Sequence, residues 1–239
     1  MLAYVKSDIG LLRETNEDSY AFVPPHLFVV ADGMGGHVAG EVASKLAIST
    51  VCEFVEKNVG TVSPEALLEQ AINQANTLIY QMSQYKEECA GMGTTVTAAY
   101  IDGNTIYWGH VGDSRMYLLN NQEFRQLTND HSLVWELVQS GTITKEEALS
   151  HPQRNMLTRA AGTSCLIKID SGMTIWEPGN ALLICTDGLT NMVSEQNIFQ
   201  LLNNRSGNGG FILDQLIEQA KNAGGFDNIT AILAQYEDA

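Results

Sequence analysis

One short segment constrains the fold of this chain most: an apolar run that ends on an aspartate and continues into glycines. Residues 27–31 are apolar and partly β-branched, so they predict a buried strand rather than a helix. Asp32 follows directly and is expected where the strand leaves the core. Gly33 and the glycines after it allow a tight turn that brings a carbonyl close to any group bound by Asp32. Taken alone, the segment also fits a strand followed by an ordinary Asp-Gly turn.

The same pattern recurs along the chain, which favours more than an ordinary turn. Asp113, Asp187 and Asp227 each lie at the border of a predicted strand, with glycine within two residues. Together with Asp32 they indicate strand ends that converge on one site. Carboxylates repel one another and are costly to bury unpaired, so a cation is expected among them. Hard oxygen ligands without a cysteine or histidine cluster favour Mg²⁺ or Mn²⁺ over Zn²⁺, and this number of acids suggests two ions.

Composition narrows the class of protein. The 239 residues are 44% hydrophobic, which is enough for a sizeable core, and the formal net charge is -15. This negative charge disfavours nucleic acid or an anionic membrane as the main partner, although much of it can serve solubility alone. The four cysteines are scattered and form no C-x-x-C pair, so reduced thiols in a cytoplasmic protein are expected. Neither a signal peptide nor a membrane-spanning run is predicted.

Apolar periodicity predicts a β-rich chain with two helical regions. Strands are expected at residues 2–5, 20–23, 27–31, 93–101, 105–111, 116–119, 124–127, 167–175, 181–185 and 229–235. Helices are expected at residues 41–58, 64–85, 195–203 and 212–222, with Ser63 as N-cap of the second and a glycine-rich turn at 207–210 before the last. Hairpin turns are predicted at residues 102–104 and 120–121.

Residues 130–163 change character and predict a flap with two short helical pieces, at 132–140 and 144–149. No linker or low-complexity stretch divides the chain, so residues 1–239 are expected to form a single domain. Strands joined by hairpins, with the helices grouped apart, predict a layered α+β fold rather than alternating βαβ units.

A resemblance to a known family covers almost the whole chain. The stretches RETNED, ADGMGGH, GMGTT, GHVGDSR, NDHSLV, CTDGLTNM and GGFDNIT occur in this order. This ordered set resembles the bacterial protein phosphatase 2C (PP2C, PPM) family of metal-dependent protein serine/threonine phosphatases. The resemblance implies two packed antiparallel sheets flanked by helices, a four-layer α/β/β/α sandwich, with metals in a cleft at one end.

The resemblance also implies roles for individual residues. Asp32 would bridge two ions of Mn²⁺ or Mg²⁺, and the Gly33 carbonyl would help to hold the second. Asp187 and Asp227 would complete the first metal site, and Asp113 would join Asp187 at a possible third. The remaining roles are water-mediated metal binding by Glu17 and Asp18, and phosphate binding by Arg13.

The implied reaction is direct hydrolysis of phosphoserine or phosphothreonine by a water that bridges the metals. Arg13 suits the phosphate because its planar fork can bind two oxygens at once. His37 is the candidate general acid for the leaving alkoxide. Met34 stands where eukaryotic relatives carry the corresponding histidine, so a metal-bound water is the alternative acid, and support of the following helix is an alternative role for His37.

Several functions remain open at this point. The first is a phosphatase that opposes bacterial serine/threonine kinases, with phosphorylated proteins, including the kinase itself, as partners of a monomeric enzyme. The alternatives are a non-catalytic module that binds phosphoproteins, a phosphatase dedicated to a partner-switching regulator, and a two-metal phosphoesterase for small molecules. The presence of all the expected acids and of Arg13 favours the first over the non-catalytic module.

Overall fold

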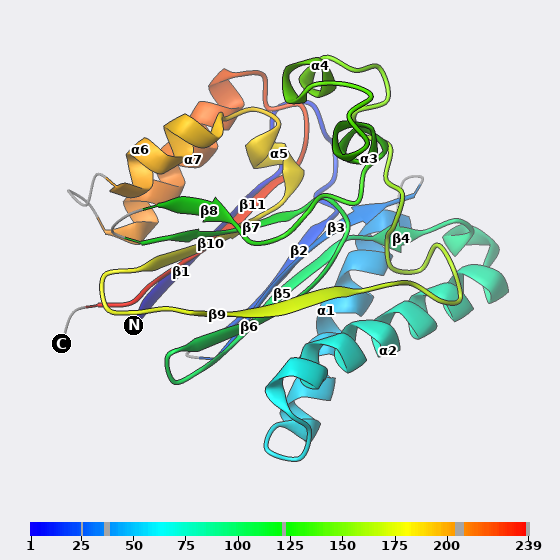
Figure 1. Ribbon diagram of the computed structural model, residues 1–239. Helices are drawn as coiled ribbons and strands as arrows, with labels where there is room; N and C mark the ends of the chain where they lie inside the picture. The colour runs from blue at the N-terminus through cyan, green and yellow to red at the C-terminus, as the bar shows by residue number, and fades with distance from the viewer. Residues whose placement is uncertain (25, 36–38, 121–122, 204–207, 238–239) are drawn as a thin grey trace.

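Two antiparallel sheets packed face to face form the centre of the molecule, and helices cover the outer face of each (Figure 1). The computed structural model describes residues 1–24, 26–35, 39–120, 123–203 and 208–237. The first sheet has the order β1-β11-β10-β7-β8 and comprises β1 Leu2–Asp8, β7 Arg115–Leu119, β8 Phe124–Gln126, β10 Ala181–Cys185 and β11 Ile229–Gln235. The second has the order β2-β3-β5-β6-β9, with β4 paired to β3, and comprises β2 Asp18–Val23, β3 Leu27–Met34, β4 Gly93–Thr94, β5 Val96–Asp102, β6 Thr105–Val111 and β9 Asp170–Ile175.

The helices form the two outer layers and a flap. Helices α1 (Ala39–Asn58) and α2 (Pro64–Tyr85) pack on the second sheet, and α6 (Glu195–Asn203) and α7 (Gly209–Asn222) cover the first. A short 3₁₀ helix, Glu87–Cys89, follows α2, and α5 (Asp187–Thr190) follows β10. Helices α3 (Leu133–Gln139) and α4 (Lys145–Leu149) belong to the flap. The arrangement confirms the predicted α/β/β/α sandwich.

Three apolar clusters hold the four layers together. Strand β3 shows the principle, because successive side chains of a strand point to opposite faces. Val29 and Ala31 pack in the cluster under α1 and α2, whereas Phe28 and Val30 pack between the two sheets. All four are fully buried, which explains why residues 27–31 read as a continuous apolar run. The third cluster lies between the first sheet and helices α6 and α7.

Some predicted boundaries are wrong for identifiable reasons. Strand β3 continues through Asp32 to Met34, because β4 pairs with its last two residues and extends it. Helix α7 begins at Gly209, earlier than predicted, because the Asn208 side chain accepts a hydrogen bond from the amide of Phe211 and caps it. Ser63 is the N-cap residue of α2 as expected, but its side chain makes no capping hydrogen bond.

Other predicted features divide into those confirmed, those corrected and those beyond the described residues. The hairpin at residues 102–104 joins β5 to β6 as predicted. The strand expected at 93–101 is divided into β4 and β5 at Thr95, and Asp187, expected at a strand border, lies two residues after β10 and begins helix α5. The general-acid candidate His37, and parts of the predicted turns at 120–121 and 207–210, lie outside the described residues. Among the described helices, none is both long and apolar enough to cross a bilayer.

The flap is attached to the turn between β6 and β7. The amide of His131 donates to the carbonyl of Gly112 at 2.7 Å, and the amide of Gly112 donates back to Nδ1 of the His131 ring at 3.0 Å. Nε2 of the same ring lies 3.2 Å from Oδ2 of Asp170, close but not aligned as a hydrogen bond. Burial lowers the pKa of His131, so the ring is neutral at physiological pH. The ring therefore fixes the root of the flap beside Asp113.

Candidate active site

Two neighbouring strands of the second sheet bring the first acids together. Asp18 begins β2 and Asp32 lies near the end of β3, and the two residues are direct partners in the strand register. Directly opposed residues of antiparallel strands have Cβ atoms about 4.5–5.5 Å apart, so like charges there are unfavourable. Thr94 and Thr95 fix the backbone of Asp32: the amide of Asp32 donates to Oγ1 of Thr95, and Oγ1 of Thr94 donates to the carbonyl of Asp32.

The turn after Asp32 packs backbone against backbone. A Cβ on Gly33 would overlap the carbonyl oxygen of Gly40 at the start of α1 and crowd that of Glu17. Only glycine fits at this approach. The amide of Gly33 donates to the carbonyl of Glu17 at 3.2 Å, and the Glu17 carboxyl group lies against Gly40. Glu17 and the Gly33 carbonyl therefore belong to the same corner of the site.

The first sheet supplies two further acids. Asp187 is the first residue of α5 and accepts a hydrogen bond from Nδ2 of Asn191 at 2.9 Å. Asp227 precedes β11, and its Oδ1 accepts a hydrogen bond from the amide of Asn228. Asn228 in turn donates from Nδ2 to the carbonyls of Ile9 and Thr15. The same side chain accepts a hydrogen bond from the amide of Glu17 through Oδ1. Asn228 thus ties the loop that carries Arg13 to the loop that carries Asp227.

These acids lie within electrostatic reach of one another. Burial, and then the charges of Asp18, Asp187, Asp113 and Asp227, raise the pKa of Asp32 well above its ordinary value. Burial likewise raises the pKa of Asp113 and Asp187, with nearby carboxylates adding to the effect. Burial raises the pKa of Asp18 to about 7 even though Thr186 donates a hydrogen bond to its Oδ2. The structure thus brings together the aspartates that the sequence singled out.

The carboxylates could hold a divalent cation, and two oxygen atoms make the case. Oδ1 of Asp18 and Oδ1 of Asp187 are buried without a hydrogen-bond partner. A buried carboxylate oxygen without a donor is unfavourable, and a hard cation satisfies it. Within the described ranges, no three His, Cys, Asp or Glu side chains are already placed to hold a metal ion together. An ion at this site therefore needs water ligands or a closer approach of the carboxylates.

Arg13 lies at the mouth of the acidic site. Its Nη2 donates to Oδ2 of Asp227 at 2.8 Å, and about half of the side chain is exposed. Burial lowers the pKa of Arg13, but the hydrogen bond and charge of Asp227 outweigh this and raise the pKa overall. The guanidinium has further N–H donors beyond the one bound to Asp227. Arg13 can therefore bind an incoming anion while the hydrogen bond to Asp227 orients the guanidinium.

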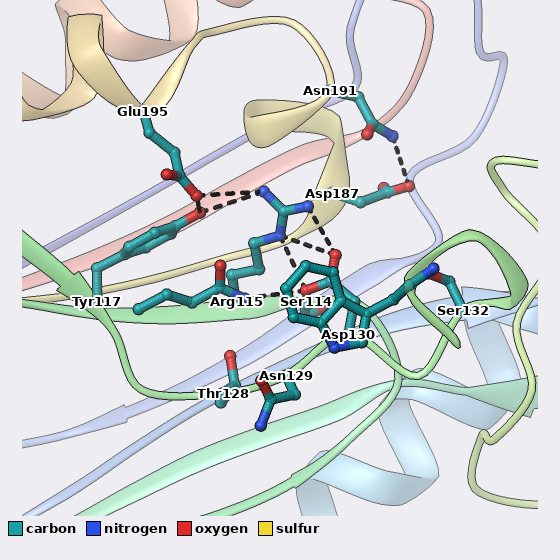
Figure 2. A network of polar contacts seen from close by, with 12 residues as sticks. Ser114, Arg115, Tyr117, Thr128, Asn129, Asp130, Ser132, Asp187, Asn191 and Glu195 are labelled. Atoms are coloured by element: carbon teal, nitrogen blue, oxygen red, sulfur yellow. Dashed lines mark hydrogen bonds and ion pairs between the residues drawn. The ribbon is translucent and has the colours of Figure 1, made fainter. Parts of the chain in front are cut away.

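A polar network that the sequence reasoning missed supports the site from the flap side. Figure 2 shows the Arg115 guanidinium between Asp130 on one side and Tyr117 with Glu195 on the other. Arg115 donates from Nε and Nη2 to the Asp130 carboxylate at distances from 2.6 to 3.0 Å. Arg115 follows Asp113 by two residues, and Asp130 begins the flap, so the pair joins them. Both residues lie inside quoted motifs, GDSR and NDHSLV, which is the only signal of the pair in the sequence.

Comparisons with known proteins agree with this geometry. Residues 14–209 match the profile of a family described as protein phosphatase 2C. The serine/threonine phosphatase stp of Listeria monocytogenes serotype 4b is 37% identical over 242 residues, covering 98% of this chain and 96% of the relative. The serine/threonine protein phosphatase PstP of Mycobacterium tuberculosis is 39% identical over 235 residues, covering 98% of this chain and 44% of the relative.

Solved structures show the same fold. The crystal structure of the Mycobacterium tuberculosis serine/threonine phosphatase PstP/Ppp superposes with a TM-score of 0.92 at 38% identity and covers 99% of both chains. A structure of the catalytic domain of PstP in complex with two manganese ions superposes with a TM-score of 0.89 at 36% identity, covering 99% of this chain and 98% of that one.

Proposed function

The chain belongs to the protein phosphatase 2C family, and from that premise we propose how its residues act. It is a metal-dependent serine/threonine protein phosphatase. The observation that carries the residue assignment is the cluster of buried, mutually repelling carboxylates in which Asp18 and Asp187 each keep an oxygen without a partner. We assign Mn²⁺ or Mg²⁺ to this cluster, with residues 1–239 forming one phosphatase domain and 130–163 its flap.

We propose the following ligand set. Asp32, whose pKa is raised by the charges of acids from both sheets, would contact two ions, and Asp187 and Asp227 would complete the first ion's protein ligands. The Gly33 carbonyl would help to hold the second ion, with Glu17 and Asp18 acting through water. Asp113, on the turn at the flap root, would join Asp187 at a third ion. A divalent cation at such a site lowers the pKa of a bound water and stabilises charge on phosphoryl oxygens.

The chain's own residues position the substrate. Arg13 would bind two oxygens of the phosphoryl group with its free donors, because guanidinium and phosphate geometries match. Asp227 holds Arg13 in place through the 2.8 Å hydrogen bond. His37, close to Asp32 in the chain, would donate a proton to the leaving serine or threonine oxygen. The flap, held by Arg115 and Asp130, would border the bound phosphoprotein.

The proposed substrates are phosphoproteins made by bacterial serine/threonine kinases, including a kinase itself. A phosphorylated partner-switching regulator would be one such substrate. An assay of its dephosphorylation would distinguish it from other phosphoproteins. We further propose that the protein is a monomer and that it lies in the cytosol, a location that the four free cysteines favour. A non-catalytic phosphoprotein-binding module is disfavoured because the metal-binding acids and Arg13 are all present.

The test is phosphate release from a phosphothreonine peptide by protein from which a chelator has removed the metal, with and without added Mn²⁺. We expect release only with the metal, and its loss in the Asp187→Ala variant, because Asp187 supplies an unpartnered oxygen to the site. A phosphotyrosine peptide is the matched control substrate. Folded, metal-loaded protein that binds the phosphothreonine peptide but releases nothing would instead identify a binding module.

Metal binding should depend on pH. We expect Mn²⁺ to raise the Tm of chelated protein, and the increase to grow between about pH 5 and about pH 7.5. Asp18 keeps its proton in the folded state up to about pH 7, whereas the unfolded chain loses it near pH 4. As the pH rises through this window, the metal-free folded protein therefore becomes less stable relative to the unfolded chain. At the same time, fewer protons compete with Mn²⁺ for the carboxylates. Thermal unfolding at each pH measures the difference.

The Asp187→Asn variant should show a smaller Mn²⁺-dependent increase in Tm at every pH. Asp102→Asn is the matched control, because Asp102 is an exposed acid in the β5–β6 hairpin. An increase that is independent of pH, or equal in the Asp187 and Asp102 variants, would contradict the assignment.

A further inference from the structure

Three large apolar side chains are exposed on the two loops that carry Arg13 and Asp227. Leu11 is 58% exposed, Leu12 is 66% exposed and Phe226 is 53% exposed. We refer to these three residues as the apolar rim. Single exposed apolar residues are ordinary on a protein surface, but several beside a functional site indicate a surface that another molecule covers.

The two loops form one structural unit. The amide of Leu11 donates to the carbonyl of Gly225 at 2.8 Å, and Arg13 donates to Asp227 at 2.8 Å. Asn228 adds three further hydrogen bonds to the first loop, so the loops cannot separate without breaking this set. Figure 1 shows the N-terminal loop passing beside the segment that leads into β11. The apolar rim is thereby fixed relative to the phosphate-binding residue.

The backbone conformation before Phe226 requires glycine. Gly224 and Gly225 have φ angles of 136° and 53°, which side chains rarely allow. A Cβ on Gly225 would lie 2.9 Å from Cγ of Leu11, and one on Gly224 would lie 2.5 Å from the Phe226 ring. The two glycines therefore let Leu11 and Phe226 lie tightly against the turn while more than half of each side chain remains exposed.

We propose that the apolar rim binds apolar side chains that flank the phosphorylated residue of the substrate protein. The inference rests on the proposed function, because it uses Arg13 as the phosphate-binding group. A phosphate bound at Arg13 arrives on a polypeptide, and an extended chain advances by roughly 3.3 Å per residue, so near neighbours of the phosphoresidue pass over these loops. The net charge of -15 disfavours acidic flanking residues and an anionic membrane, and the exposed side chains of Leu11, Leu12 and Phe226 favour apolar flanking residues.

The test compares two phosphothreonine peptides that differ only in the residues beside the phosphothreonine, leucine in one and alanine in the other. With Mn²⁺, the native chain is expected to prefer the leucine peptide in kcat/KM by about tenfold, or about 1.4 kcal/mol, as partial burial of apolar side chains provides. The difference between the two peptides should appear in KM rather than in kcat. In the triple variant Leu11→Ala, Leu12→Ala, Phe226→Ala the ratio of the two kcat/KM values should fall towards one.

The matched control is Leu78→Ala, which removes a 38% exposed leucine from α2, the helix layer on the second sheet. This variant should keep the native ratio of the two kcat/KM values. A native ratio near one, or a ratio that the triple variant leaves unchanged, would overturn the proposal while phosphate release itself upholds the phosphatase. Absence of metal-dependent release from both peptides would instead contradict the proposed function. A dimer of the native chain that the triple variant dissociates would assign the apolar rim to self-association and also overturn the proposal.

Discussion

Replacement of Asp32 by asparagine should abolish phosphate release, by at least about a thousandfold, and yet stabilise the metal-free fold. Asp32 is the residue whose pKa responds to all four of the other aspartates in the site. Asparagine has almost the same shape but is never ionised, so it avoids the cost of burying an acid among the other carboxylates, which raises the pKa of Asp32. The free energy of unfolding of chelated protein should therefore rise at neutral pH, with an increase in Tm of about 2–4 °C per kcal/mol gained.

Two measurements check this prediction together. Phosphate release with Mn²⁺ reports the loss of activity, and thermal unfolding in chelator reports the stability. Asp102→Asn should change neither, because its carboxylate lies in an exposed hairpin. A variant that loses its activity together with its fold would show that Asp32 is structural, and a variant that keeps its activity would remove Asp32 from the metal site.

Replacement of Arg13 by alanine should lower kcat/KM by about a hundredfold to a thousandfold, because a charged donor to the phosphoryl oxygens is lost. Arg13→Lys should recover only part of the loss, since lysine keeps the charge but lacks the planar fork. Inhibition by inorganic phosphate should weaken in parallel. Stability should change little, by less than about 0.5 kcal/mol, because the Arg13–Asp227 pair lies at the surface.

The matched control is Arg125→Ala, which removes an exposed arginine of the edge strand β8 that pairs with Glu123. Steady-state kinetics on the phosphothreonine peptide separate the contributions to kcat and KM. If Arg13→Ala and Arg125→Ala behave alike, Arg13 does not contact the phosphate. If Arg13→Lys is fully active, a positive charge alone is sufficient.

Much of the fold could be predicted because its elements are bounded by strong local signals. Strands β10 and β11 and helix α6 have the predicted bounds, since each is an apolar or amphipathic run closed by glycine, aspartate or asparagine. Prediction failed where a distant partner decides the structure. The pairing of β4 carries β3 beyond Asp32, and no local signal at Met34 reveals it.

The site shows the same division. Aspartates beside glycines at strand borders could be found by inspection, and the structure brings them together. Their partners could not be found in this way. The Thr186 hydroxyl that donates to Asp18 is 168 positions away. The link from Arg115 to Asp130 depends on how the segment after β8 lies against β7. Such contacts follow from tertiary packing, which a single sequence encodes only indirectly.

The place of β11 in its sheet has a consequence for how the enzyme comes to be active during synthesis. β11 lies between β1 and β10, so the C-terminal strand of the sandwich occupies an interior position beside the N-terminal strand. Asp227 lies two residues before β11, whereas Asp18 and Asp32 lie near the N-terminal end of the sequence. A nascent chain that stops short of Asp227 lacks both an interior strand and an acid of the site. Catalysis therefore cannot precede synthesis of β11, and long-range pairing of this kind is intrinsically slow to form.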